Sequence, residues 1–198
     1  MREAFDAGQR DFGENYVQEA LAKITELADL KANSGDPIRW HLIGPLQSNK
    51  AREVAANFDW VHSVDRMKLA QRLSDLRPPT LAPLQVCLQV NISGEDSKSG
   101  VAPEATLALA REVAGLPGLK LRGLMAIPEP AADLAAQRAP HRALRKLLEA
   151  LNAEGLDLDT LSIGMSADLE AAVAEGATWV RVGTAIFGSR PAKSVPTS

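Results

Sequence analysis

Two short motifs near the end of the sequence carry residue types that can hold an anion. In GMS, Ser166 follows an apolar run at the expected start of a helix, where its hydroxyl and free backbone N–H groups can face a phosphate. In RVGT, Gly183 lets the backbone approach a ligand closely, and Thr184 adds a hydroxyl donor. These residues predict a phosphate site, and the alternative is an N-cap serine and a turn glycine that bind nothing.

The RVGT motif also contains a cation, Arg181. Arg181 stands between Val180 and Val182, so strand alternation places it on the face opposite the two valines. A buried arginine is costly unless it is paired. Arg181 is therefore expected either to meet the charge of a ligand or to pair with a buried carboxylate such as Glu14.

The other reactive side chains predict no metal site and no catalytic residues. His41 and His62 lie in apolar runs, where a core histidine is the more common reading. With His141 they show no metal-ligand spacing, and the single cysteine, Cys87, lies in the apolar run LQVCLQV as an expected core residue. No pair of carboxylates is placed for acid–base chemistry.

Strand-like and helix-like segments alternate along the whole chain, and this alternation must position the motifs. Strands are expected at 12–15, 38–44, 60–64, 84–92, 119–127, 160–165 and 179–188. Helices are expected at 16–31, 49–58, 66–76 (with Asp65 as N-cap), 103–115, 141–155 and 166–176. Such alternation predicts parallel strands joined by right-handed crossovers.

Two architectures fit this pattern, a doubly wound sheet and a (β/α)8 barrel. No G-x-G-x-x-G motif follows the first strand, which disfavours the dinucleotide-binding form of the former. A barrel needs eight strands and seven are visible. The chain opens with MREAFDAG, which resembles the end of a helix closed by Gly8, so an eighth strand would precede Met1.

In barrels of this kind the working residues lie at the carboxyl ends of the strands. The polar and soft residues expected there are Glu14, Asn15, His41, His62, Ser63, Asn91, Ser93, Met125, Met165, Ser166, Arg181, Gly183 and Thr184.

Composition sets the general class. The chain has 198 residues, of which 45% are apolar and 24% charged, which suits a single domain over 1–190 with a flexible polar tail at 191–198. The net charge of −3 gives no reason to expect nucleic acid or an anionic membrane as a partner. Neither a signal peptide nor a transmembrane stretch is recognisable, so a cytoplasmic location is expected.

Seven ordered motifs carry a family resemblance over roughly residues 1–190. They are FGENYVQE, HLIGPLQSNK, VHSVDR, VNISGEDSKSG, GLMAIP, LSIGMSADLEAAV and VRVGTAIFG. In this order and spacing they resemble the pyridoxal 5′-phosphate (PLP) homeostasis proteins, which are similar to the N-terminal barrel of bacterial alanine racemase standing alone.

This resemblance implies a monomeric, PLP-binding (β/α)8 barrel that buffers PLP and delivers it, with PLP-dependent apo-enzymes as possible recipients and no established catalysis. It places the phosphate among Ser166, Gly183 and Thr184 and turns Arg181 toward the pyridine nitrogen. A cation there does not favour a protonated ring, which makes the ring a weaker electron sink. Three further residues would lie at the cofactor: Asn15, Met165 and His41.

One family feature has no counterpart in the sequence. The family holds PLP as a Schiff base to a lysine at the end of the first strand, in a segment resembling S-K-T-K-P, which would precede Met1. Neither Lys50 nor Lys98 matches that position. We expect a chain that lacks the N-terminal helix and first strand through an internal start, a real short form being the alternative, and expect two unpaired sheet edges.

Two other functions remain open. A PLP-dependent racemase needs a second base, normally a tyrosine from another domain, and Tyr16 is the single tyrosine of this chain. A PLP-independent phosphometabolite isomerase or lyase would need an acid–base pair that the sequence does not display.

Overall fold

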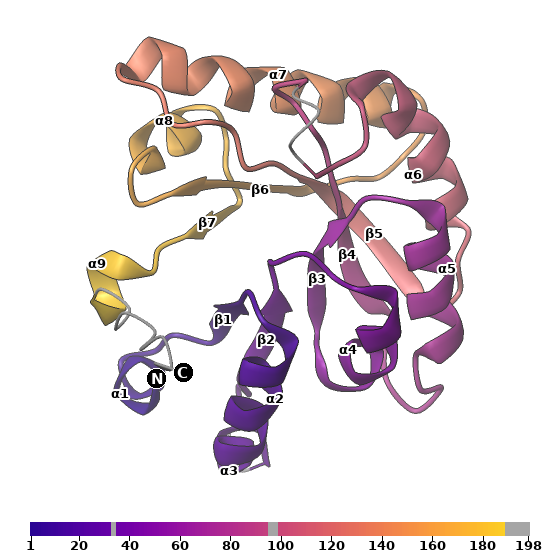
Figure 1. Ribbon diagram of the computed structural model, residues 1–198, viewed down its shortest axis with the longest axis vertical. Coiled ribbons are helices and arrows are strands. Elements are labelled where there is room, and N and C mark those ends of the chain that lie inside the picture. Colours follow the sequence, from indigo (N-terminus) through magenta and orange to yellow (C-terminus); the bar gives the residue numbers. More distant parts are fainter. Residues whose placement is uncertain (33–34, 95–98, 189–198) are drawn as a thin grey trace, which may run out of the picture.

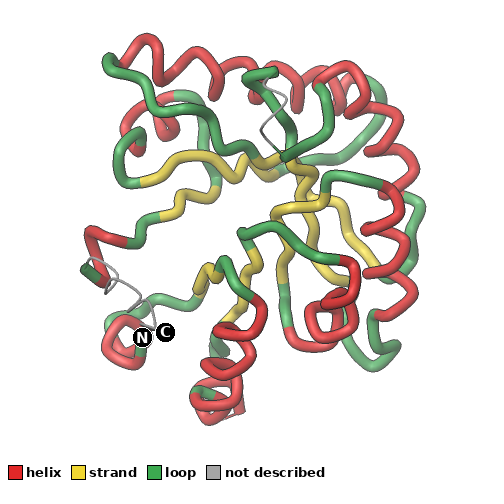
Figure 2. The backbone as a smooth tube through the Cα atoms, in the orientation of Figure 1, coloured by secondary structure: helices red, strands yellow, loops and turns green. Residues whose placement is uncertain are grey.

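The computed structural model describes residues 1–32, 35–94 and 99–188. Seven parallel strands pair strictly in chain order and curl into a nearly closed barrel with helices outside it (Figures 1 and 2). The strands are β1 (Asp11–Glu14), β2 (Arg39–Leu42), β3 (Trp60–Val64), β4 (Leu84–Gln89), β5 (Leu119–Met125), β6 (Thr160–Met165) and β7 (Trp179–Arg181). This confirms the predicted barrel of parallel strands. Among the described strands β1 and β7 are the two edges, as expected.

Helices follow the strands and cover the outer face of the barrel. They are α1 (Arg2–Asp6), α2 (Val17–Glu26), α3 (Ala28–Ala32), α4 (Ala51–Asn57), α5 (Met67–Leu76), α6 (Thr106–Ala114), α7 (Leu134–Ala153), α8 (Leu169–Ala174) and α9 (Thr184–Phe187). Two 3₁₀ turns, η1 (Ser48–Lys50) and η2 (Pro103–Ala105), lead into α4 and α6. Within the described ranges, no helix is both long and apolar enough to cross a membrane.

Apolar side chains form two separate clusters. The large one fills the layer between strands and helices, with Leu42, Leu69 and Leu144 fully buried there. Each such leucine contributes about 1.5–3 kcal/mol by leaving water. The small one lies inside the barrel and consists of Trp60, Cys87 and Met125 with Trp179 packed against it. Cys87 is completely buried, which confirms it as a core residue.

The first helix ends as its sequence predicts. Gly8 has a φ of 100°, a left-handed conformation that glycine adopts freely, and its N–H bonds to the carbonyl of Phe5. The Arg2 guanidinium donates to both oxygens of Asp29 at 2.7 and 2.9 Å, which ties α1 to α3.

Helix α7 begins seven residues before the expected start at His141. Asp133 caps it by accepting the N–H of Ala136 at 2.8 Å, and Pro140 lies inside the helix. A proline usually ends a helix because it removes a backbone bond and crowds the preceding turn. Here the aspartate cap and the packing of this long helix against α8 and the barrel outweigh that cost.

Other boundaries also differ from expectation. The strand expected over 179–188 ends at Arg181, and Thr184–Phe187 forms α9, because a short apolar run does not distinguish strand from helix. The helix expected over 16–31 divides at Leu27 into α2 and α3. Asp65 does not cap α5; its carboxylate bonds to Arg66 instead. The predicted tail at 191–198 and Lys98 lie outside the described residues.

Candidate functional site

The carboxyl ends of β6 and β7 bring the two phosphate motifs together. In the parallel pairing, Met165 lies opposite Arg181, so the residues that follow each strand emerge at the same end of the barrel. Ser166, Gly183 and Thr184 are all exposed there. A Cβ atom built on Gly183 would meet nothing within 4 Å, so open space lies next to its backbone. We call these three residues the rim.

The loop after β6 owes its shape to Asp168. This carboxylate accepts the Met165 N–H at 2.7 Å and bonds His141 Nε2 at 2.9 Å. Helix α8 begins at Leu169, so the expectation that Ser166 starts the helix is wrong. The cause is that Asp168 takes the cap position and leaves Ser166 in an exposed turn.

Arg181 is anchored from inside the barrel. Its Nη1 donates to the Ser162 carbonyl at 2.8 Å and to the Ser162 hydroxyl at 2.9 Å, and its Nη2 donates to the Ala126 carbonyl at 2.9 Å. Burial lowers the pKa of Arg181 to about 10, so it remains a cation at neutral pH. The alternative pairing with Glu14 does not occur, because Glu14 accepts from Lys23 Nζ at 2.6 Å.

Part of this guanidinium is left for another acceptor. Three of its five N–H groups are used in the contacts above. Among the described residues, the Nε–H and the second Nη2 hydrogen of Arg181 have no partner. Arg181 therefore offers fixed donors to an acceptor placed near the rim.

A chain of hydrogen bonds continues from Arg181 across the barrel interior. The Ser162 hydroxyl lies 2.8 Å from His62 Nδ1, and His62 Nε2 lies 2.9 Å from His41 Nδ1. His41 Nε2 then lies 3.0 Å from Asp11 Oδ1. We call these five residues, from Asp11 to Arg181, the interior relay.

Aromatic rings and charges complete the surroundings of the interior relay. Trp60 stacks on the His41 ring at 5.5 Å with an interplanar angle of 7°. Burial raises the pKa of the Asp11 carboxyl, but hydrogen bonds from His41 and Arg39 outweigh it and hold that pKa well below its usual range. Burial, together with the neighbouring His41 and Arg181 side chains, lowers the pKa of His62 well below its ordinary value.

The remaining expected residues lie in different places. Met165 is part of the turn beside the rim and is 40% exposed, which leaves its side chain accessible at this end. Asn15 is exposed directly after β1, at the opposite edge of the sheet. Its carbonyl oxygen would lie only 2.1 Å from a Cβ atom built on Gly44. His41 is buried inside the barrel and reaches Arg181 through His62 and Ser162.

Sequence reasoning missed the two relay members that are not histidine or arginine. Asp11 and Ser162 are polar residues within strands, and that placement was the available signal. The sequence did not indicate which side chains they would contact, since the His62–Ser162 bond joins residues 100 positions apart.

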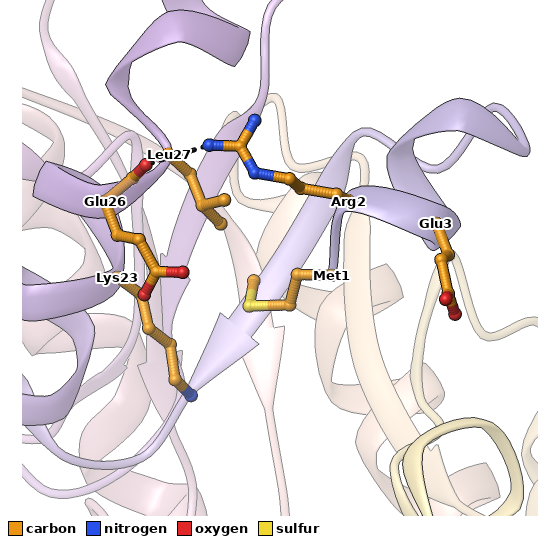
Figure 3. A pocket seen from close by; sticks show the side chains of 6 residues that line it. All are labelled: Met1, Arg2, Glu3, Lys23, Glu26 and Leu27. Atoms are coloured by element: carbon orange, nitrogen blue, oxygen red, sulfur yellow. Dashed lines mark hydrogen bonds between the residues drawn. The ribbon is translucent and has the colours of Figure 1, made fainter.

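One hollow lies away from the rim. It is a groove of about 440 Å³ between α1 and α2, lined by Met1, Arg2, Glu3, Lys23, Glu26 and Leu27 (Figure 3). Arg2 crosses it to donate to the Glu26 carbonyl at 3.0 Å. A second hollow of about 50 Å³ lies between the β5–α7 loop and the turn after β6, and Met165 and Asp168 line it. Across the described ranges, His, Cys, Asp and Glu form no group of three that could hold a metal ion.

Comparison with known proteins shows the family of this chain. The profile of the family "Alanine racemase, N-terminal domain" matches residues 1–191. A Pseudomonas aeruginosa protein named pyridoxal phosphate homeostasis protein is 65% identical over 190 residues, covering 96% of this chain and 79% of the relative. The Escherichia coli protein of the same name is 52% identical over 190 residues, covering 96% of this chain and 80% of its own length.

A solved structure shares the fold closely. PipY of Synechococcus elongatus, in its structure with PLP bound, superposes with a TM-score of 0.83 at 43% identity, over 94% of this chain and 85% of PipY. The family match and the extended sequence identity together decide the assignment. The chain belongs to the alanine racemase N-terminal domain family and, within it, to the pyridoxal phosphate homeostasis proteins.

Proposed function

We propose that this protein binds PLP at the carboxyl end of its barrel and serves in PLP homeostasis as a carrier rather than an enzyme. The observation that carries the proposal is the rim beside Arg181. It combines two exposed hydroxyls and an open glycine backbone with a partly buried cation that has unused N–H donors. The relatives named for PLP homeostasis and the PLP-bound PipY structure support it.

The residues present fit a phosphorylated pyridine. Ser166 and Thr184 would donate hydroxyl hydrogens to the phosphate, and the space at Gly183 admits the phosphate close to the backbone. Arg181 would hold a donor toward the ring nitrogen, which keeps that nitrogen without a proton. When bound, PLP supplies a reactive aldehyde, and a carrier protects that aldehyde from indiscriminate amines.

The arrangement favours a carrier over a racemase. The single tyrosine, Tyr16, is 51% exposed beyond β1, whereas the rim lies beyond β6 and β7. We further propose that 1–190 forms one PLP-binding domain, that the protein acts as a monomer in the cytoplasm, and that PLP-dependent apo-enzymes receive its cargo. For the chain as given we also propose noncovalent binding through the rim.

Equilibrium dialysis against PLP tests this proposal. We expect the parent chain to retain PLP and inorganic phosphate to compete with it. Replacing both rim hydroxyls (Ser166→Ala with Thr184→Ala) should weaken PLP affinity about tenfold or more, since each lost hydrogen bond costs about 1 kcal/mol. Thr25→Ala is the matched control, because it removes an exposed hydroxyl that bonds the Leu21 carbonyl on α2. A parent chain that retains no PLP, or rim variants that bind like the control, would refute the proposal.

A further inference from the structure

The interior relay crosses the barrel from one sheet edge to the other. It starts at Asp11 on β1, passes His41 on β2 and His62 on β3, and ends at Ser162 on β6 and Arg181 on β7. The four contacts measure 3.0, 2.9, 2.8 and 2.9 Å. His41, His62 and Ser162 are each at most 4% exposed, so bulk water does not satisfy them.

Bonding requirements give this chain a direction. Asp11 is ionised, because its pKa lies well below the usual range, so it can only accept, and His41 Nε2 must carry a hydrogen. A neutral His41 then has a bare Nδ1 that accepts. Since His62 Nε2 faces that nitrogen, it must be the donor.

The same logic extends to the other end. A neutral His62 with hydrogen on Nε2 has an accepting Nδ1, so the Ser162 hydroxyl must donate to it. The lone pairs of that hydroxyl accept from Arg181 Nη1. Every bond therefore points the same way, from Arg181 toward Asp11, with both histidines in the Nε2–H form.

We propose that Ser162, His62 and His41 are positioning residues for Arg181. They hold its guanidinium through a one-way hydrogen-bond relay whose direction is set by the Asp11 carboxylate. Through this relay the histidine pair fixes how Arg181 presents its free N–H groups to the ring of a bound ligand. The inference rests on the proposed function for the ligand ring, but not for the relay itself.

Charged and titratable groups around the pair come from several strands. Asp11 on β1 faces His41 and is itself held by Arg39 on β2. Arg181 on β7 raises the cost of charging His62, and Cys87 on β4 is held as a neutral thiol because burial raises its pKa. From β5, Arg122 lies 5.1 Å over the Trp60 ring and is paired with Asp159, at the start of β6.

Nitrogen-15 NMR of the ligand-free protein tests the direction of the relay. The chain has three histidines, so each long-range ¹⁵N–¹H pattern can be assigned by substituting one histidine at a time. We expect His41 and His62 both to be neutral Nε2–H tautomers near pH 7. A Nδ1–H tautomer at either position would overturn the inference.

Two variants probe the ends of the relay. Ser162→Ala removes the hydroxyl but leaves Arg181 its carbonyl bonds to residues 162 and 126, so the fold has reason to survive. It should shift the His62 Nδ1 resonance and leave His141, which bonds Asp168, unchanged. Asp11→Asn supplies both a donor and an acceptor, so His41 should no longer be confined to one tautomer.

Ligand binding separates this inference from the proposed function. Ser162→Ala should weaken PLP about fivefold near pH 7, the loss expected for one hydrogen bond. Ser162→Thr, which keeps a hydroxyl, should restore PLP affinity. Affinity for inorganic phosphate, which does not use Arg181, should stay at the parent value in each variant.

Each outcome has a separate meaning. Equal PLP affinity in Ser162→Ala and the parent would overturn the positioning role while leaving PLP binding intact. A parent that binds phosphate but not PLP would refute the proposed function and the role toward a ring together. The tautomers, which need no ligand, would still decide whether the relay runs one way.

Discussion

The Asp168 carboxylate accepts the backbone N–H of Met165 at 2.7 Å and so closes the turn that follows β6. The other carboxylate oxygen bonds His141 on α7, so this turn is fastened to a long helix. Ser166 lies within the closed turn, and its place at the rim depends on Asp168, a residue outside the rim.

The first prediction concerns that contact. Asp168→Ala should weaken PLP about three- to tenfold, because the turn loses the bond that shapes it. Asp168→Asn should bind nearly as well as the parent, because its amide oxygen still accepts from Met165. Dialysis against PLP measures both. If the negative charge near the phosphate mattered more than the turn, both variants would bind more tightly.

A second prediction contrasts two glycines. A Cβ on Gly123 in β5 would lie 1.8 Å from the Thr160 carbonyl oxygen, so Gly123→Ala should lower the free energy of unfolding by about 3 kcal/mol or more. Gly183→Ala meets open space and should change the free energy of unfolding by less than about 0.5 kcal/mol. Urea unfolding measures both.

The same pair should behave differently toward the ligand. Gly183→Ala fills space that the phosphate is proposed to occupy, so it should bind PLP more weakly while remaining as stable as the parent. A stable Gly183→Ala protein with full PLP affinity would move the phosphate away from this glycine.

The third prediction is a pH dependence. Glu175 is 2% exposed and accepts from Arg142 at 2.9 Å and Arg138 at 2.7 Å, and these contacts lower its pKa to about 2. A carboxyl with a lowered folded pKa contributes stability above its ordinary value near 4.5 and loses it as the pH falls toward 2. The parent should therefore lose stability on acidification more steeply than Glu175→Gln.

Thermal unfolding between pH 3 and 7 measures this difference. The gap between parent and Glu175→Gln should be widest near neutral pH and should narrow as the pH falls below about 4.5. A gap that stays constant over this range would mean that the ionised carboxylate is not what the arginines stabilise.

The fourth prediction concerns covalent capture. Lys50 in η1 lies 3.6 Å from Glu53, and a protonated, ion-paired ammonium is a poor nucleophile toward an aldehyde. Treatment with PLP and then borohydride should give no stoichiometric pyridoxyl adduct on Lys50 or Lys98. Intact-protein and peptide mass spectrometry provide the readout, and a full adduct on either lysine would show that noncovalent binding is the wrong description.

Local patterns predicted most of the architecture. The alternation of apolar runs located all seven strands, and Gly8 marked the end of α1. Boundaries failed where a single contact overrode propensity: Asp133 started α7 ahead of Pro140, and Asp168 displaced Ser166 from the start of α8. Such caps are decided by which side chain the backbone meets in space.

The candidate site, like the fold, was predictable from the sequence only in part. Ser166, Gly183 and Thr184 could be brought together from sequence, because neighbouring parallel strands end at the same side of a sheet. The relay could not, because His62 and Ser162 meet across the barrel after three intervening strand pairings. In the sequence His41 and His62 resemble ordinary core residues, but in the barrel their buried side chains form a chain of hydrogen bonds.

The strand order has a consequence for how the molecule is assembled. Because each strand pairs with its neighbour in sequence, β1 to β6 can add one by one as the chain leaves the ribosome, each closing a short loop. The His62–Ser162 contact cannot form until β6 is in place. Formation of this contact would therefore report when the growing sheet has curled far enough to bring β3 and β6 together. Refolding kinetics followed at His62 would time that step.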